Sequence, residues 1–299
     1  MIRRLTAVFL ICVLAPIATA SASPQGWILF ESERDGNMDI YMARPDGSDL
    51  RRLTTDAAPD SSPSVSRDGT TVAFVSGRDG NFELYLMDVD GTNVRRLTQT
   101  ALDEAYPAWS PDGTRIACSQ VGTAGAEICL VDVVSGEVRP ITRNEVDDWA
   151  PSWSPSGDKI AFASGRFPNN CICVMAPDGG ELVTLTPCTG YHGAPKWSPD
   201  GSLIAYYQEV TPGNTDIFVM DAVGGNARRL TSHSQPDEFP VWSPDGRYLA
   251  FASLRAGGYA DVYTLCVASP FDSVISVSPA PRGWDCPGAW IADSPTPAP

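Results

Sequence analysis

Short apolar runs alternate with polar, glycine-containing turns along nearly the whole chain. The unit from Pro107 to Thr142 illustrates the pattern, because it contains four apolar runs with a turn or loop between successive runs. Such runs match the length of an average β-strand, about 5 to 6 residues. No stretch beyond residue 22 has a convincing helical period. One unit therefore predicts a small sheet of four strands.

This unit recurs at a nearly constant interval. The turn after its first strand carries a five-residue phrase, in most copies Trp-Ser-Pro-Asp-Gly, and successive copies start 44, 44, 44 and 45 positions apart. The five copies begin at Val65, Trp109, Trp153, Trp197 and Trp242. A fixed period of this size is typical of a β-propeller, in which each repeat forms one blade.

Other positions recur within each unit. The second strand has a small residue before a larger one, as in Val72-Ala73-Phe74, and the third strand carries an aromatic residue, as in Glu83-Leu84-Tyr85. We expect the small residue to let adjacent sheets approach and the aromatic ring to fill the gap between them. The next hairpin contains Asp-Gly in three units, as at Asp178-Gly179, and glycine accepts the positive φ that a two-residue turn needs.

The two ends of the chain predict how the ring closes. Residues from Trp27 to Thr54 supply the second, third and fourth strands of a blade that lacks its first strand. Gly288-Ala289-Trp290 resembles a first strand with nothing after it. Because the shared blade would leave no open sheet edge, we expect an all-β, six-bladed propeller of four-stranded blades over residues 23–292.

The repeated phrases W-S-P-D-G, I-A-F, R-D-G-N-x-D-I-Y and R-L-T are similar to those of the TolB-like, WD40-like (PD40) β-propeller family. The resemblance covers nearly all of the chain beyond residue 22 and implies the fold, but it specifies no single function. TolB proteins carry a further N-terminal α/β domain, for which the residues before Trp27 leave no room, so we expect the propeller alone. Related propellers cover the active site of prolyl-oligopeptidase-type hydrolases, whose Gly-x-Ser-x-Gly phrase is absent from this sequence.

The first 22 residues have the features of a secretory signal peptide. Two arginines precede an apolar run from Leu5 to Ala18, and Ala20-Ser21-Ala22 matches a cleavage site. An uncleaved membrane anchor is the alternative, although the run is shorter than the ~20 residues of a spanning helix and contains Pro16. Residues 293–299 are proline-rich and predict a disordered tail. We therefore expect a secreted or periplasmic protein without a transmembrane segment in its mature chain.

The chain is strongly acidic. Its 21 Lys and Arg against 36 Asp and Glu give a formal net charge of −15, and removal of residues 1–22 with their two arginines gives 19 − 36 = −17. Such a surface disfavours nucleic acid and anionic lipid as partners. Basic proteins, cations and neutral glycans remain open, and we expect a single-domain monomer.

Seven cysteines remain beyond residue 22, which fits an oxidising compartment. Cys118 and Cys129 occupy facing slots of neighbouring strands, so we predict a disulfide between them. Counting along the next unit places Cys171 near Cys188 and predicts a second bridge. A zinc site at Cys171-x-Cys173 is a weaker alternative, because no second metal-spaced pair accompanies it. Three cysteines remain without an assigned role: Cys173, Cys266 and Cys286.

Six residues at one equivalent position precede the first strand of each blade and should ring one mouth of the central channel. They are Asp60, Glu104, Asp148, His192, Asp237 and Asp285. Five carboxylates there would attract a divalent cation or a basic side chain of a partner. The alternative is structural: each acid caps its loop or pairs with an arginine of the same face. The candidate partners are Arg34, Arg78, Arg166 and Arg255.

Five aromatic residues lie in the same loops, outside the repeated core positions. They are Tyr106, Trp149, Tyr191, Phe239 and Trp284. Exposed aromatic side chains beside carboxylates suit a surface that binds peptide or sugar. They tuck between blades in the alternative interpretation, because Trp and Tyr are often only partly buried.

No catalytic group of nucleophile, base and orienting residue can be assembled from the sequence. The two histidines, His192 and His233, are too few for the metal site of a propeller lyase. We therefore expect a binding module rather than an enzyme, without a catalytic residue, a metal site or a required cofactor. The leading hypothesis is a protein or peptide partner at the acidic, aromatic mouth; a carbohydrate or cell-wall ligand is the alternative, and a hydrolase or lyase the third.

Overall fold

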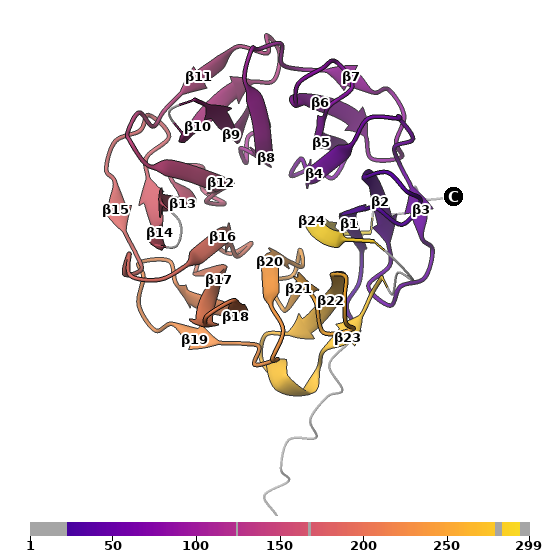
Figure 1. Ribbon diagram of the computed structural model, residues 1–299, viewed down its shortest axis with the longest axis vertical. Helices are drawn as coiled ribbons and strands as arrows, with labels where there is room; N and C mark the ends of the chain where they lie inside the picture. Colours follow the sequence, from indigo (N-terminus) through magenta and orange to yellow (C-terminus); the bar gives the residue numbers. More distant parts are fainter. Residues whose placement is uncertain (1–22, 124, 167–168, 279–282, 294–299) are drawn as a thin grey trace, which may run out of the picture.

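The computed structural model describes residues 23–123, 125–166, 169–278 and 283–293. Within these ranges the chain forms six antiparallel sheets of four strands each, and one short 3-10 helix spans Pro270–Asp272. The sheets stand around a central axis as the blades of a propeller (Figure 1). The predicted all-β, six-bladed fold is therefore confirmed.

Each blade runs from an inner strand beside the central channel to an outer strand at the rim (Figure 1). From inner to outer strand, the blades are β24 (Asp285–Ile291), β1 (Trp27–Ser32), β2 (Asp39–Ala43) and β3 (Arg51–Arg52); β4 (Asp60–Val65), β5 (Thr71–Ser76), β6 (Glu83–Asp88) and β7 (Arg95–Arg96); β8 (Asp103–Trp109), β9 (Arg115–Gly122), β10 (Gly125–Asp132) and β11 (Val138–Pro140); β12 (Asp147–Trp153), β13 (Ile160–Arg166), β14 (Asn169–Met175) and β15 (Val183–Thr184); β16 (His192–Trp197), β17 (Leu203–Thr211), β18 (Asn214–Asp221) and β19 (Arg228–Arg229); and β20 (Asp237–Trp242), β21 (Tyr248–Ser253), β22 (Asp261–Cys266) and β23 (Ile275–Ser276).

The two ends of the chain close the ring, as predicted. The C-terminal strand β24 pairs antiparallel with β1, and the register places Leu29 opposite Ala289 and Ser32 opposite Asp285. Figure 1 shows this blade as the one place where indigo and yellow strands lie side by side. The hydrogen bonds of this pair satisfy the edges that an open ring would expose.

The core lies between neighbouring blades. Second-strand rings such as Phe30 and Phe74 are fully buried, and each packs against the facing aromatic residue of the third strand. The Phe30 and Tyr41 ring centroids are 6.0 Å apart. The third-strand aromatic residue therefore packs in the core, as the repeat predicted.

The repeated Trp-Ser-Pro-Asp-Gly phrase has a local structural cause. Asp112 Oδ1 accepts hydrogen bonds from the Ser110 hydroxyl at 2.6 Å and from the Thr114 amide at 3.0 Å, which fixes the turn between β8 and β9. These bonds lower the pKa of Asp112 to about 2. The preceding Trp109 donates its indole N–H to the Ser64 carbonyl of the adjacent blade at 3.2 Å. The phrase thus builds the turn, and at Trp109 and Trp242 its indole N–H also donates to the neighbouring blade.

One of the two predicted disulfides is present. Cys171 in β14 is bonded to Cys188, which follows β15. The Cys118–Cys129 prediction was wrong, because both thiols are unbonded and buried. Their register is the predicted one, but directly opposed Cβ atoms lie about 4.5 to 5.5 Å apart in antiparallel strands, whereas a disulfide needs about 3.5 to 4.5 Å.

Both predicted terminal features fall outside the described residues: the signal peptide of residues 1–22 and all of the proline-rich tail except Asp293. In the described part of the chain, no helix combines the length and apolar character needed to cross a bilayer.

Candidate functional site

All six inner strands carry a β-bulge at the same place. The register with the second strand shifts there, for example between Ala105 and Ala108 in β8. In five of the six blades, the second residue after the predicted ring residue has a positive φ, between 45° and 53°: Ser62, Tyr106, Ala150, Ala194 and Phe239. Non-glycine residues hold this left-handed conformation at a cost of order 1 to 3 kcal/mol, and such positions cluster at functional sites.

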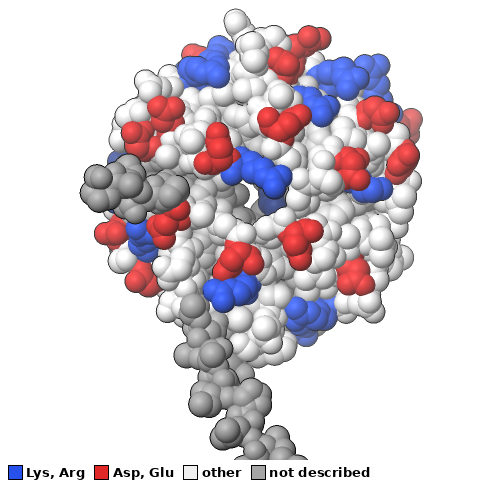
Figure 2. Space-filling view, turned by 180° about the vertical axis from the view of Figure 1, so that it is seen from behind, with Lys and Arg blue, Asp and Glu red and all other residues white. Residues whose placement is uncertain are grey.

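The bulges surround one central cavity of about 500 Å³, and all five left-handed residues line it. A second cavity of about 200 Å³ adjoins it and shares Tyr106, Trp149 and Phe239 as walls. Figure 2 shows one face of the molecule hollowed at its centre, with charged side chains around the opening. The combined space has the size and the apolar lining of a small ligand site.

The sequence contained a signal for these bulges that we did not use. Each left-handed residue is followed by a proline, as in Tyr106-Pro107 and Phe239-Pro240. Proline inside a sheet is confined to edges and bulges because it cannot donate to the strand ladder. A proline at the same place in five of the six inner strands therefore indicates a repeated bulge.

The predicted ring residues meet at one end of the inner strands, but they are buried: exposure ranges from 0% to 4%. Three follow one pattern. Arg78 Nη2 donates to Asp60 at 2.9 Å, and its Nε donates to Ser76 at 2.7 Å. The same Asp, Ser and Arg positions pair in the Asp237–Arg255 contact at 2.9 Å and the Asp285–Arg34 contact at 2.6 Å. Pairing with an arginine, the structural alternative, describes these three acids.

The other three ring residues have no arginine partner among the side chains that the structure describes. Glu104 accepts hydrogen bonds from Thr98, Thr100 and Gln120, and burial raises its pKa to about 7. Asn144 donates to Asp148 at 2.8 Å, and burial raises the Asp148 pKa. His192 Nδ1 lies 2.9 Å from the Asn170 carbonyl oxygen, to which it donates. The side chain of Arg166, the fourth candidate arginine, lies outside the described residues.

No described group of three or more His, Cys, Asp or Glu residues is arranged to hold a metal ion. Because the ring carboxylates already have partners, a ligand that reached them would have to displace those contacts. The side chains that line the cavity, and that a ligand could contact, lie instead one to four residues further along the inner strands.

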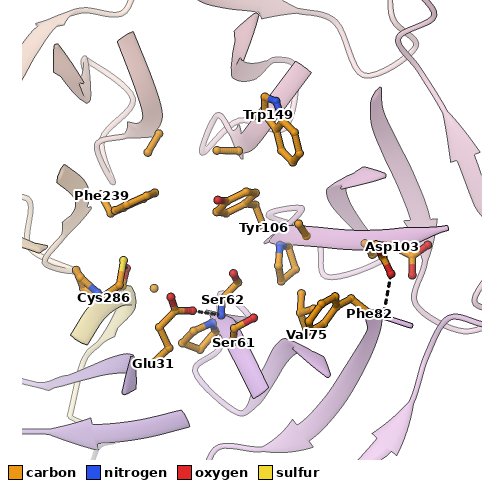
Figure 3. Close-up of a pocket in the computed structure, with 18 of the residues that line it drawn as sticks. Glu31, Ser61, Ser62, Val75, Phe82, Asp103, Tyr106, Trp149, Phe239 and Cys286 are labelled. Atoms are coloured by element: carbon orange, nitrogen blue, oxygen red, sulfur yellow. Dashed lines mark hydrogen bonds between the residues drawn. The ribbon is translucent and has the colours of Figure 1, made fainter. Parts of the chain in front are cut away.

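The five predicted aromatic residues do converge. Tyr106, Trp149, Phe239 and Trp284 line the larger cavity, and Tyr191 lines the smaller one. Each is half-buried, and Tyr106 and Trp149 meet edge to face with centroids 6.1 Å apart. Figure 3 shows the Trp149, Tyr106 and Phe239 side chains approaching the cavity from three different inner strands.

Tyr207 of β17 also belongs to this cluster and was missed. Its ring lies 5.7 Å from Phe239, and its hydroxyl donates to the Tyr191 hydroxyl at 3.2 Å. The sequence did contain a sign of its role. Tyr207 follows the large second-strand residue, a position that holds small side chains such as Ala163 and Ala252 in other blades.

Two charged cavity residues were also missed, Glu31 and Lys196. The Glu31 carboxylate accepts the Ser62 amide N–H at 2.6 Å, a bond drawn in Figure 3. Burial raises the pKa of Glu31 to about 7 and lowers that of Lys196 to about 8. Both occupy repeat slots that hold small or uncharged residues elsewhere, so each is a local departure from the repeat.

A closed ring around an aromatic-lined cavity defines the molecule as a β-propeller with a central space of ligand size. Residues 12–106, 103–209 and 182–280 match the family described as the TolB beta propeller domain (PD40). The chain therefore belongs to the TolB beta propeller domain family.

Relatives and solved structures agree with this assignment. A TolB homologue from Chlorobium luteolum is 50% identical over 40 residues, a match that spans 13% of this chain and only 9% of that protein. The structure of TolB from Acinetobacter baumannii covers 90% of this chain and 67% of its own, with 21% identity and a TM-score of 0.77.

Other propellers of different function have a similar fold. An oligogalacturonate lyase from Vibrio parahaemolyticus is 17% identical, covers 85% of this chain and 74% of its own, and gives a TM-score of 0.55. A chain of the nidogen/laminin complex is 10% identical, covers 87% of this chain and 96% of its own, and gives a TM-score of 0.70. At these identities the matches establish the fold alone, which is found in both an enzyme and a protein complex.

Proposed function

We propose that this chain is an exported binding propeller that holds a protein or peptide partner at the aromatic mouth of its central channel. The observation that carries the proposal is the convergence of half-buried aromatic side chains, Tyr106, Trp149 and Phe239 among them, on a cavity edged by strained backbone. Aromatic anchors in a desolvated pocket provide most of the binding energy in many protein interfaces.

The carboxylate ring has a supporting role in this proposal. Its acids are buried and paired, as with Asp60 and Arg78, so they hold the inner strands in place and leave contact to the aromatic layer. The net charge of −15 still favours approach of a basic segment, because long-range attraction raises association rates.

Export fits two features of the chain. The Cys171–Cys188 disulfide is typical of proteins that fold outside the reducing cytosol. The sequence of residues 1–22 adds the pattern of a secretory signal peptide.

A carbohydrate ligand is the second candidate. Trp149 and Trp284 are half-buried in the cavity wall, and sugars pack against such rings. A fold neighbour is named as an oligogalacturonate lyase. We propose no catalytic step, because no nucleophile and base are placed together among the cavity residues described above.

Site-specific photo-crosslinking tests the protein-binding proposal. A benzoylphenylalanine replaces Trp149 in the cavity or, as the matched control, Val134, which is 95% exposed on an outer hairpin. In envelope extract from the host, we expect discrete protein adducts from position 149 and none of the same mass from position 134. Adducts shared by both positions, or adducts from 134 alone, would place partners elsewhere. Retention of glycan by the unaltered chain without protein adducts would favour the second candidate.

A further inference from the structure

Lys196 is an exception within the repeat. It lies directly before the inner-strand tryptophan of β16 and lines the central cavity. The five equivalent positions carry short side chains: Ser64, Ala108, Ser152, Val241 and Ala289. The chain has only two lysines in total, and the other, Lys159, lies in the turn between β12 and β13. Lys196 therefore places a long cationic side chain at a position that carries a short side chain in the other five blades.

The surroundings of Lys196 are apolar and aromatic. It lines the 500 Å³ cavity together with Tyr106, Phe239, Trp284 and Cys286. Figure 3 shows Phe239 and Cys286 from neighbouring strands on one side of this space and Tyr106 facing them. Desolvation by these walls lowers the pKa of Lys196 to about 8, so its ammonium remains largely charged at neutral pH.

The Lys196 ammonium has no ion-pair or hydrogen-bond partner among the described residues. Its situation differs from that of the channel-end arginines, since Arg34, Arg78 and Arg255 each donate to a buried aspartate. Buried charges in proteins are normally paired, because an unpaired one loses its hydration without compensation. Lys196 is half-buried, so its ammonium loses only part of its hydration, and an anion in the adjoining cavity would provide the counter-ion that the described residues do not.

The acidic groups of the cavity are weak competitors for that role. Burial raises the pKa of both Glu31 and Glu104 to about 7, so below neutral pH each carboxyl is mostly uncharged. Glu31 is further engaged by the Ser62 amide. Asp103 lies at the exposed rim, where it accepts the Phe82 amide N–H. The Cys286 thiol is neutral, since burial raises its pKa well above the ordinary value.

We propose that the central cavity binds a small organic anion with a flat apolar body, whose carboxylate or sulfonate pairs with the Lys196 ammonium. The aromatic side chains of Tyr106, Trp149 and Phe239 pack against the body of the ligand. A cavity of about 500 Å³ falls within the range of about 300 to 1,000 Å³ that small-molecule sites occupy. The ligand would occupy the same cavity as the proposed protein or peptide partner, but its binding depends on Lys196, and the test below needs no protein partner.

A matched pair of probes tests the charge requirement. 2-Naphthoate and 2-naphthamide have the same ring system, and only the first is anionic. Calorimetric titration of the purified chain at about pH 6, where Lys196 is charged and the carboxyls are mostly neutral, should give naphthoate at least about tenfold tighter binding than naphthamide. Equal affinities, preference for the amide, or no detectable binding of naphthoate would each overturn the proposal.

Variants assign the effect to the lysine. Lys196→Met keeps the apolar stem and should lose at least about tenfold of the naphthoate affinity while leaving naphthamide binding within about twofold. Lys196→Arg keeps the charge and should retain preference for the anion. Lys159→Met is the control and should bind as the unaltered chain does. Undiminished naphthoate binding by a folded Lys196→Met variant would overturn the proposal, and if that variant does not fold, the two-probe comparison on the unaltered chain decides.

Discussion

Two adjacent layers of the channel differ in how their side chains vary from blade to blade. In the ring layer at the start of the inner strands, three blades repeat the same contact of aspartate, serine and arginine, as in Asp237, Ser253 and Arg255. Two residues further on, in the cavity layer, the blades present side chains as different as Ser62, Ala150 and Phe239. The left-handed backbone conformation of the cavity layer nevertheless repeats in five of the six blades.

This contrast separates structure from recognition. Side chains that repeat from blade to blade meet the same neighbours in every blade, so they serve what the blades share, which is folding and closure. Side chains that differ between blades at equivalent backbone positions are not needed for the shared fold. They suit recognition of a ligand that lacks the six-fold symmetry of the ring. Glu31, Lys196 and Tyr207 belong to the second group. The comparison predicts large stability effects from the repeated side chains and small ones from the varied side chains.

The sharpest test compares two phenylalanines. Phe162 of β13 is 1% exposed between blades, whereas Phe239 is half-buried at the cavity. Phe162→Ala should lower the free energy of unfolding by about 3 to 5 kcal/mol, because it removes a fully buried ring and leaves a void. Phe239→Ala should lower it by only about 1 kcal/mol, since part of the ring already faces solvent. Urea unfolding followed by fluorescence measures both, and similar losses would remove the distinction between the layers.

A second test concerns the ring layer. Asp237→Asn leaves Arg255 without its counter-ion and should destabilise the fold by about 2 to 4 kcal/mol in the same assay. The matched control in the same blade is Asp245→Asn, in the exposed turn between β20 and β21, with an expected loss below about 1 kcal/mol. If Asp237→Asn folds with unchanged stability and loses partner binding, the ring acts in recognition and the structural interpretation fails.

The sequence predicted the repeated part of this molecule well. The spacing of Trp109, Trp153 and Trp197 defines the blades. The incomplete blade that starts at Trp27 and the single first strand that contains Trp290 define the closure. Both inferences rest on local patterns that every copy reinforces. The Cys171–Cys188 bridge followed from the same counting, because strand register fixes which residues approach.

The cavity was harder to predict for physical reasons. Lys196 and Glu31 are 165 positions apart and line the same cavity only after all six blades have closed. The left-handed conformation at Ala150 depends on a bulge, and the residue type alone does not predict it, because alanine has no preference for a positive φ. The Cys118–Cys129 error shows the limit of register: it identifies facing residues, but the bond needs a closer approach than flat pairing gives.

The pH dependence of stability tests the cavity carboxylate. Burial raises the pKa of Glu31 from 4.5 to about 7. Between these values the unfolded chain loses this proton while the folded chain keeps it, so stability present below about pH 4.5 is lost as the pH rises to about 7. Glu31→Gln removes this loss, and the fall in unfolding free energy from pH 4.5 to pH 8 should shrink by about 1 to 2 kcal/mol. Glu137→Gln, on an exposed outer hairpin, should leave it unchanged; an unaltered profile in Glu31→Gln would contradict the assignment.

The smallest expected effect addresses the strain of the bulges. Ala150 holds a φ of 52°, a conformation that glycine adopts without steric cost. Ala150→Gly should therefore be neutral or stabilising by up to about 1 kcal/mol, although glycine elsewhere weakens strands. Ala161→Gly, at a fully buried position of the adjacent strand β13, should instead lose about 1 kcal/mol or more. Equal losses in both variants would mean that the bulge is relaxed, and its repetition around the cavity would then reflect inner-strand geometry alone.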